Sequence, residues 1–180
     1  EAGVEALAVV GNHESKRNAQ WVDLLQDLGL VRRLGREPVV VGEVAFYGVD
    51  HTPSSRVPEF DYSFGPGEEE VEHNVLVLHG LFEPFPFGEW SLEEFVDESS
   101  VEWDAFMLGD YHHPERAGID GAVAAYCGST ERASVDEKES RGYNVFEFDD
   151  DVFLERRALE TREFVTIEAE LVEGGTEEII

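Results

Sequence analysis

Short apolar runs separated by polar turns dominate the chain, and most of them predict β-strands. Residues 7–10, 75–78 and 104–108 are typical of short buried strands, because their side chains are mostly apolar without regular alternation. Three further pairs of runs, each separated by a short turn, predict hairpins: 39–41 with 44–47, 116–119 with 122–126, and 143–148 with 152–157. Residues 164–171 alternate between apolar and polar and predict a final strand.

Two segments have the spacing of helices. Between residues 15 and 28, apolar side chains recur on one helical face, with Ser15 as the N-cap and Gly29 as the stop. That face carries Trp21, Leu24, Leu25 and Leu28. A shorter helix is predicted over 91–97, where Ser91 and Glu94 form a capping box. Residues 50–70 are rich in Pro, Ser, Gly and Glu and predict a long loop.

Polar residues accompany the end of each of the three buried runs. Asn12 and His13 follow the first run, His79 ends the second, and Asp110 and His112 follow the third. In open α/β sheets, the carboxyl ends of the strands bring chemical groups together at one edge. We therefore predict an α/β fold whose candidate site is assembled from these three loops.

The residue types in these loops suit a metal centre. Asn12 offers a carbonyl oxygen, Asp110 a carboxylate, and His79 and His112 offer imidazoles. This mixed set suits Mn or another first-row divalent ion and lacks the thiolates of a structural zinc site. Two such ions can clamp a phosphoryl group and activate a water molecule. His13 could protonate the leaving group or stabilise charge in the transition state.

Each candidate also has a purely structural interpretation when it is taken alone. His79 could be a packed histidine and Asp110 a loop-capping residue, but their order along the chain favours ligands. His51 is predicted to be a turn residue, His73 to be solvated within an acidic run, and His113 to be a neighbour of the site.

Two other features leave alternatives open. Arg132 could bind a substrate phosphate, or it could pair with Glu131 or Asp136. The phenylalanines of residues 82–87 could line a substrate groove, although packing is the favoured interpretation.

The charge balance is unusually acidic. The 180 residues include 41 Asp and Glu against 13 Lys and Arg, for a formal net charge of -28, and the carboxylates are spread along the whole chain. Such self-repulsion becomes tolerable at molar salt, where the Debye length falls to roughly 3 Å. We therefore hypothesise a salt-accumulating halophile, the alternative being an acidic mesophilic protein. At molar salt, acidity is only weak evidence against a nucleic-acid partner, because counterion release contributes little.

The length and the cysteine content limit the number of domains and the cellular compartment of the protein. A chain of 180 residues with 42% hydrophobic residues suits one domain with a substantial core. The sole cysteine, Cys127, has no partner for an internal disulfide and carries no sign of reactivity. A reducing cytoplasm is therefore the expected compartment. The chain has no apolar run long enough to span a bilayer, and no signal-like leader opens it.

Two sets of motifs carry a resemblance to known enzymes. Gly-Asn-His-Glu at 11–14, His-Gly at 79–80 and Gly-x-x-His at 109–112 resemble the calcineurin-like metallophosphoesterases. Tyr-Cys-Gly-Ser-Thr-Glu-Arg at 126–132, with Arg-Gly-Tyr at 141–143, is similar to DNA repair exonucleases of the SbcD type and their archaeal counterparts. The resemblance runs from about residue 6 to residue 158.

The resemblance implies an α/β sandwich of two mixed β-sheets flanked by helices, here missing its first β-α-β units. Residues 1–158 would form a partial nuclease domain, and residues 159–180 a final strand and the start of a linker or capping region. The implied activity is hydrolysis of phosphodiester bonds in DNA during double-strand-break repair, by exonuclease or endonuclease action. Two divalent metal ions, expected to be Mn, would be the cofactors.

The resemblance also implies roles by motif position. Asn12, His79 and Asp110 would bind the second metal ion, His112 would bind the first, and His13 would be the catalytic histidine. The family usually has His where this chain has Asp110, so we expect an altered metal preference. The family's Asp-x-His and Gly-Asp-x-x-Asp motifs, which supply most of the first metal site, are absent. We infer an N-terminally truncated domain that is inactive by itself if the missing ligands are essential, and that leaves sheet edges exposed.

The partners implied by the resemblance are DNA, an SMC-like ATPase and a second copy of the complete protein. Two rival functions stay open: a small-molecule phosphodiesterase or phosphatase of the same superfamily, and a non-catalytic scaffold subunit. Activity on a simple phosphomonoester without activity on DNA would favour the first. Failure of the complete protein to bind Mn would favour the second.

Overall fold

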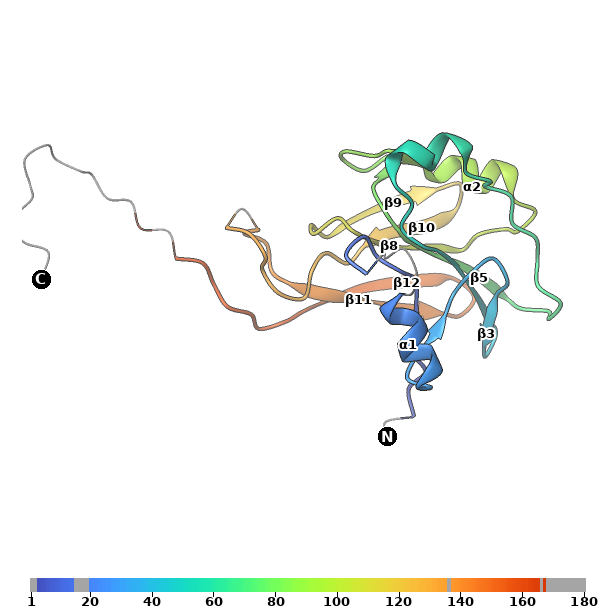
Figure 1. The fold of residues 1–180 in the computed structure, drawn as a ribbon, viewed down its shortest axis with the longest axis horizontal. Helices are drawn as coiled ribbons and strands as arrows, with labels where there is room; N and C mark the ends of the chain where they lie inside the picture. The colour runs from blue at the N-terminus through green and yellow to red at the C-terminus, as the bar shows by residue number, and fades with distance from the viewer. Residues whose placement is uncertain (1–2, 15–19, 136, 166, 168–180) are drawn as a thin grey trace, which may run out of the picture.

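The molecule is built around one mixed β-sheet of six strands, in the order β3-β4-β5-β8-β10-β9 (Figure 1). The computed structural model describes residues 3–14, 20–135, 137–165 and 167. The sheet consists of β3 (Val39–Val41), β4 (Val44–Val49), β5 (His73–His79), β8 (Ala105–Gly109), β9 (Glu115–Ile119) and β10 (Ala122–Tyr126). The strands β4, β5, β8 and β10 are parallel, whereas the edge strands β3 and β9 are antiparallel to their neighbours. The predicted α/β class is therefore confirmed.

The predicted hairpins are present. Strands β3 and β4 pair around a turn in which Gly42 has a φ of 63°. Strands β9 and β10 pair around Asp120 and Gly121, which have φ values of 46° and 94°. Two central residues with positive φ are what a tight hairpin turn of the favoured handedness requires, and Asp-Gly supplies them at low cost.

One face of the sheet is covered by helix α2 (Leu92–Glu98) and a dense aromatic core. Leu76 and Leu78 of β5 and Phe106 of β8 point to this face, and all three are almost fully buried. The helix was predicted within one residue at each end. Its capping box was wrong, however, because the Ser91 side chain makes no cap hydrogen bond. Ser91 instead ends β7 (Trp90–Ser91), which pairs with β6 (Phe82–Glu83).

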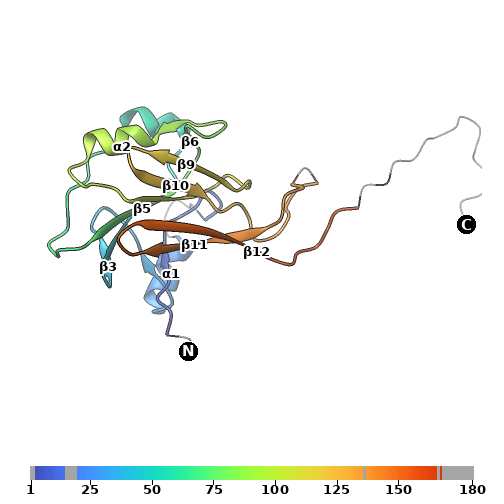
Figure 2. The ribbon, with the colours of Figure 1, turned by 180° about the vertical axis from the view of Figure 1, so that it is seen from behind.

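The opposite face carries the antiparallel pair β11 (Gly142–Phe148) and β12 (Val152–Ala158), as Figure 2 shows from behind. Alternation along β5 and β8 directs Val75 and Ala105 to this side, where Phe146, Phe148 and Val152 pack. The Phe46 and Phe148 rings meet edge to face at 6.5 Å. The prediction of a sandwich of two mixed sheets is therefore confirmed only in part, because the sheet that faces the mixed one has two antiparallel strands.

His73 was expected to be solvated, and that prediction was wrong. Strand β5 begins at His73, ahead of the apolar run, and only 8% of this residue is exposed. Its Nε2 lies 2.8 Å from the carbonyl oxygen of Asp149, in the β11–β12 turn, and its ring packs against Phe148. His73 therefore ties the hairpin to the sheet.

The N-terminal part forms a small separate pair, β1 (Leu7–Ala8) parallel to β2 (Arg32–Arg33), joined through α1 (Trp21–Asp27). The helix begins later than predicted. Gln20 is extended, and its N–H donates to the Asp23 carboxylate across the first turn. The predicted N-cap Ser15 lies outside the described residues. Gly29, with a φ of 69°, follows the helix as predicted.

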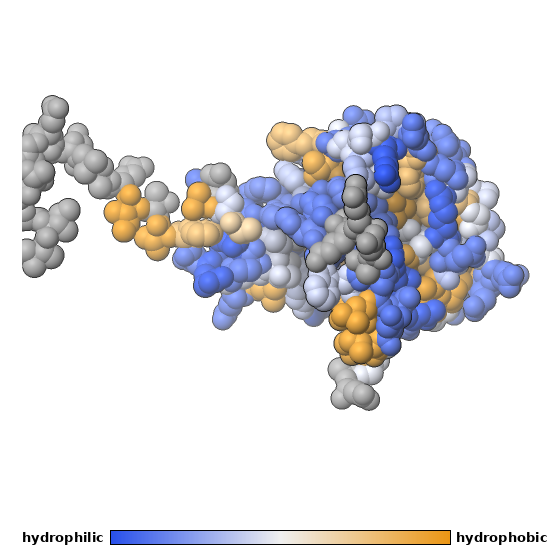
Figure 3. Space-filling view, viewed as in Figure 1, coloured by the Kyte–Doolittle hydropathy of each residue, from blue (hydrophilic) through white to orange (hydrophobic). Residues whose placement is uncertain are grey.

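The apolar face of α1 is turned to solvent. Side chains on and just after this helix are at least two-fifths exposed: Trp21, Leu24, Leu25, Leu28 and Leu30. Figure 3 shows an orange group where α1 lies, in agreement with the exposed leucines of this segment. Helical periodicity was read correctly here, but within the described residues only Val22 of α1 is buried. An exposed apolar patch of this kind usually marks a contact surface.

The remaining segments complete the description. The predicted loop over 50–70 contains a short 3-10 helix, η1 (Ser54–Glu59). The predicted final strand over 164–171 lies largely outside the described residues, and residues 164, 165 and 167 are not in a strand. Among the helices of the described chain, none has the length and hydropathy needed to cross a membrane.

Candidate functional site

The carboxyl ends of β4, β5 and β8 lie side by side at one edge of the sheet. Val49 is opposite Leu78, and His79 is opposite Gly109, so the loops that follow emerge together. The loop after β1 is attached to the same edge through Val10. Its N–H donates to the Asp50 carboxylate at 2.7 Å, and its carbonyl accepts from the His51 N–H at 2.7 Å. The Asn12 loop is thereby brought to the sheet.

Asn12, His79 and Asp110 meet at this edge, as the sequence predicted. The Asn12 Nδ2 donates to Asp110 Oδ1 at 2.9 Å, and the His79 Nε2 lies 3.6 Å from the same oxygen. The His79 Nε2 is buried and makes no hydrogen bond with the described residues. A buried ring nitrogen without a hydrogen-bond partner is costly, and its position beside a carboxylate and an amide fits the role of a metal ligand.

Two glycines allow the His79 ring to occupy this position. A Cβ atom at Gly109 would lie 2.9 Å from His79 Nδ1, and one at Gly11 would lie 3.0 Å from His79 Cε1. These distances are too short for a larger residue unless the ring moves. The glycine that opens each motif is therefore required by close packing around the imidazole.

The electrostatics favour a neutral imidazole at His79. Burial lowers the pKa of His79, and the nearby His51 and His13 lower it further, while the Asp110 carboxylate opposes them. Neutral imidazole is the form that binds metal ions. The backbone of Asp110 has a φ of 93°, a conformation that few residues with a side chain adopt. Strained positions of this kind are concentrated at functional sites.

His13 and His112 lie differently. His13 is exposed in the turn after Asn12, close enough to influence His79. His112 is half-exposed, and its Nδ1 lies 2.8 Å from Glu137 Oε1. Among the residues that the structure describes, no group of three or more His, Cys, Asp or Glu side chains is close enough together to hold a metal ion. The donors of Asn12, His79 and Asp110 fit a divalent ion in kind, but they are few in number.

His51 belongs to this edge, although it was predicted to be a turn residue. Its ring meets that of His79 edge to face at 6.1 Å, and its Nδ1 is buried without a hydrogen-bond partner among the described residues. The signal was available in the chain order. His51 follows β4, which is parallel to β5, so its loop had to emerge beside His79.

The predictions for Arg132 and for the Phe-rich loop have different outcomes. The Arg132 guanidinium donates to the carbonyls of Glu137, Glu139 and Arg162 and to the Thr161 hydroxyl. Its proposed contact with a substrate phosphate stays a prediction. In the loop, Phe82 and Phe85 are buried, which supports packing, whereas Phe87 is 78% exposed.

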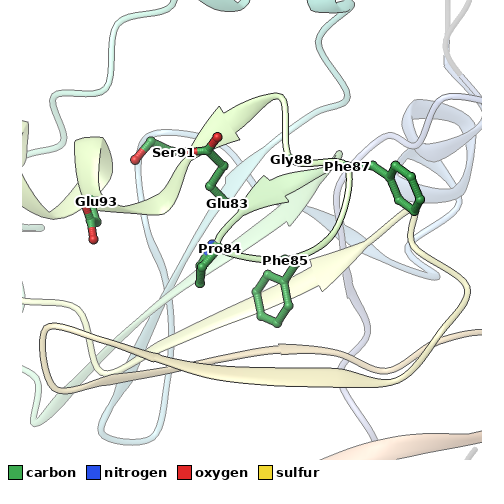
Figure 4. Close-up of a pocket in the computed structure, with 7 residues that line it drawn as sticks. All are labelled: Glu83, Pro84, Phe85, Phe87, Gly88, Ser91 and Glu93. Carbon is green, nitrogen blue, oxygen red and sulfur yellow. The ribbon is translucent and has the colours of Figure 1, made fainter.

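Figure 4 shows the hollow beside that loop, with Phe87 on the far side of the loop from Pro84 and Glu93. The hollow has a volume of about 440 Å³. Two acidic residues, Glu83 and Glu93, contribute to its lining. Carboxylates repel phosphate, so this hollow is a poor match for a nucleic-acid backbone.

The fold and the site together define a class: a mixed α/β protein that gathers amide, imidazole and carboxylate groups at the carboxyl edge of a parallel core, consistent with a metallophosphoesterase-type fold. No protein-family profile matches the chain. Comparison with curated proteins shows that it is a homologue of the DNA double-strand break repair protein Mre11.

The identity to these relatives extends over nearly the whole chain. It is 54% over 172 residues with Mre11 of Haloferax volcanii, 46% over 175 residues with that of Halobacterium salinarum, and 40% over 174 residues with that of Methanosarcina mazei. These alignments cover 95%, 95% and 94% of the chain. They cover 38%, 45% and 28% of the relatives, so the chain spans less than half the length of the proteins that it matches.

Proposed function

We propose that the complete protein is a metal-dependent nuclease that hydrolyses phosphodiester bonds in DNA during double-strand-break repair, and that this chain contributes part of its catalytic site. The observation that carries the proposal is the meeting of Asn12, His79 and Asp110 at one sheet edge, in a chain 54% identical to a DNA double-strand break repair protein. The same homology supports the finer fold that we propose, a metallophosphoesterase sandwich.

The residues of the site have distinct proposed roles. Asn12, His79 and Asp110 hold one divalent ion through oxygen and neutral imidazole donors. The buried Nε2 of His79, which has no hydrogen-bond partner among the described residues, supports this assignment. His112 contributes to a second ion. Manganese suits this donor set, and the ions when bound would supply an activated water and neutralise charge on the phosphate. His13, exposed beside them, donates a proton to the leaving oxygen.

The test is degradation of linear DNA by the complete protein with Mn²⁺ in molar KCl. The wild type is expected to degrade DNA, and His13→Ala to lose about 10²- to 10⁴-fold in rate, the usual contribution of a positioned proton donor. His113→Ala is the matched control, because its ring is bound to Glu139 at 3.2 Å and has no proposed role in the reaction. Equal activity in His13→Ala and wild type would remove His13 from the mechanism.

A non-catalytic scaffold subunit is the second candidate. It is favoured by the shortage of metal-binding groups within the described chain. Counting Mn²⁺ bound by the complete protein in molar KCl separates the two functions. A nuclease should bind the metal with defined stoichiometry, whereas a scaffold should not. Hydrolysis of a simple phosphate ester with bound Mn²⁺, but no cutting of DNA, would instead indicate a small-molecule phosphoesterase.

The partners are proposed on two grounds. DNA follows from the repair role, and an SMC-like ATPase follows from the resemblance to repair nucleases. A homodimer of the complete protein is supported by the exposed apolar side chains of α1, such as Trp21 and Leu25. Substituting Leu25 by Glu should convert the complete protein to a monomer in sedimentation measurements, while Glu at the exposed Val41 should not.

The strongly acidic composition supports an enzyme adapted to molar salt, and the single cysteine supports a cytoplasmic location. A net charge of -28 destabilises the compact state through self-repulsion, which salt screens. Relatives from Haloferax volcanii and Halobacterium salinarum agree with a halophilic source. The midpoint of thermal unfolding should rise as KCl increases from 0.1 M to the molar range (roughly the range over which the Debye length falls from about 10 Å to 3 Å). An unchanged midpoint would contradict the halophile hypothesis.

A further inference from the structure

A buried ion pair lies in the segment that follows β10. Glu137 is 4% exposed and Arg141 is fully buried, and the Arg141 Nη1 lies 3.4 Å from Glu137 Oε2. Charges removed from water are expensive, and a buried pair needs further hydrogen bonds to be tolerated. The partners of this pair therefore indicate what it is used for.

Both residues of the ion pair contact His112. Glu137 Oε1 lies 2.8 Å from His112 Nδ1, and Glu137 Oε2 accepts a hydrogen bond from the Ala133 N–H at 2.9 Å. The Arg141 Nη1 donates to the His112 carbonyl oxygen at 2.9 Å and to the Ser129 hydroxyl at 3.0 Å. The side chain and the main chain of one residue are thus fixed by a single buried ion pair.

This arrangement determines which nitrogen of His112 carries its proton. An ionised carboxylate only accepts hydrogen bonds, so the Nδ1 that faces Glu137 must be the donor. In a neutral imidazole the proton is then on Nδ1, and Nε2 keeps a free lone pair. A carboxylate behind a metal-binding histidine has this same effect in many metal sites, where it sets both the tautomer and the ring orientation.

We propose that Glu137 is a positioning residue that orients His112 and presents its Nε2 to a divalent metal ion, with Arg141 holding Glu137 in place. The inference rests on the proposed function, because it assumes that His112 is a ligand. It assigns a role to the Glu137–Arg141 ion pair and to Ser129, which contact His112 or each other.

The neighbouring histidine offers a matched control within the same loop. Glu139 Oε2 also pairs with Arg141 Nη2, at 3.2 Å. The same oxygen lies 3.2 Å from a histidine Nδ1, that of His113. Glu139 is half-exposed, and His113 has no proposed metal role. Glu139→Gln therefore removes a carboxylate from the same arginine and from an adjacent imidazole without touching His112.

The experiment measures two properties of the complete protein in molar KCl. Binding of Mn²⁺ is followed by the electron paramagnetic resonance of the free ion. The tautomer of His112 is read from ¹⁵N chemical shifts of histidine-labelled, metal-free protein, with the signal assigned by its loss in His112→Gln. The wild type should show His112 protonated at Nδ1. Glu137→Gln should populate the other tautomer and weaken one Mn²⁺ site by about 10- to 100-fold, and Glu139→Gln should change neither property.

A merely structural role would give a different pattern. Glu137→Gln would then lower the midpoint of thermal unfolding, with the His112 tautomer and the Mn²⁺ affinity as in Glu139→Gln, and that result would overturn the inference. If Glu137→Gln does not fold, the Glu137→Met/Arg141→Met double variant replaces the pair by apolar side chains of similar length. A folded double variant that binds Mn²⁺ as tightly as the wild type would also overturn it.

The outcomes separate this inference from the proposed function. Tight Mn²⁺ binding by the wild type, unaffected by Glu137→Gln, would leave the nuclease proposal standing and remove the role of Glu137. Failure of the wild type to bind Mn²⁺ would overturn both. A wild-type His112 protonated at Nε2 would overturn the positioning role alone, whatever the metal affinity.

Discussion

On the α2 side of the central sheet, aromatic rings are packed against one another, whereas on the β11–β12 side the covering is partial. Phe95 of α2 is fully buried and has the rings of Phe60, Tyr62, Phe64, Phe82 and Trp90 as neighbours. On the other side a hollow of about 570 Å³ opens between the sheet and the hairpin, and its lining includes His79, Gly109 and Cys127. The closed face stabilises the fold, and the open face adjoins the candidate site.

Removing one aromatic ring from each face should show this difference as a difference in stability. Phe95→Ala should lower the free energy of unfolding by about 3–5 kcal/mol, as for other fully buried phenylalanines. Phe148→Ala on the hairpin side should cost roughly 1–2 kcal/mol, because that ring is only partly buried. Urea unfolding in molar KCl measures both. Equal losses would show that the two faces contribute alike.

Acid titration tests the edge where the open face meets the site. Burial lowers the pKa of His79 in the folded protein, so below about pH 6.5, the ordinary imidazole pKa, the unfolded chain takes up the proton more readily. Stability from this group is therefore constant above that pH and falls as the pH drops towards the folded-state pKa. The slope is at most about 1.4 kcal/mol per pH unit.

The measurement is urea unfolding of the metal-free protein at a series of pH values. The His79→Gln variant should lose this part of the pH dependence. A variant at His113 is the control, because that ring pairs with Glu139 and is not among the groups that shift the pKa of His79. A slope in His79→Gln that equals the wild-type slope would contradict the assignment to His79.

The smallest expected effect concerns Cys127, which lines the hollow on the open face. Burial raises the pKa of the Cys127 thiol, and its Sγ donates to the Gly128 carbonyl at 3.2 Å. Thiolate is the reactive form, so alkylation at pH 8 should be about tenfold or more slower in the folded protein than in urea. Timed labelling with iodoacetamide measures the ratio. A ratio near unity would mean that the open face exposes this cysteine fully.

Much of the fold and half of the site could be predicted because local rules apply to them. The Asp120-Gly121 turn identifies its hairpin through the backbone angles that these residues favour. The meeting of Asn12, His79 and Asp110 follows from loops that leave the same edge of the sheet.

What could not be predicted depends on contacts between distant segments. Glu137 is one carboxylate among many in the sequence, and its contact with His112 exists only because the chain turns back after β10. His73 is buried by a hairpin 76 residues further along the chain. The periodicity of α1 was visible in the sequence, but whether its apolar face is covered depends on neighbours outside the helix.

The left-handed backbone at Asp110 limits what evolution can place there. At a φ of 93°, glycine is accepted freely, asparagine, aspartate and histidine are the side chains most often tolerated, and β-branched residues are strained by roughly 1–3 kcal/mol. The three tolerated side chains all carry an atom that can bind a metal ion. In a selection from all substitutions at this position, β-branched residues should be depleted through lost stability, independently of any effect on activity. The exchange of histidine for aspartate that the resemblance to calcineurin-like enzymes implies is thus one of the few that this backbone geometry leaves open to drift.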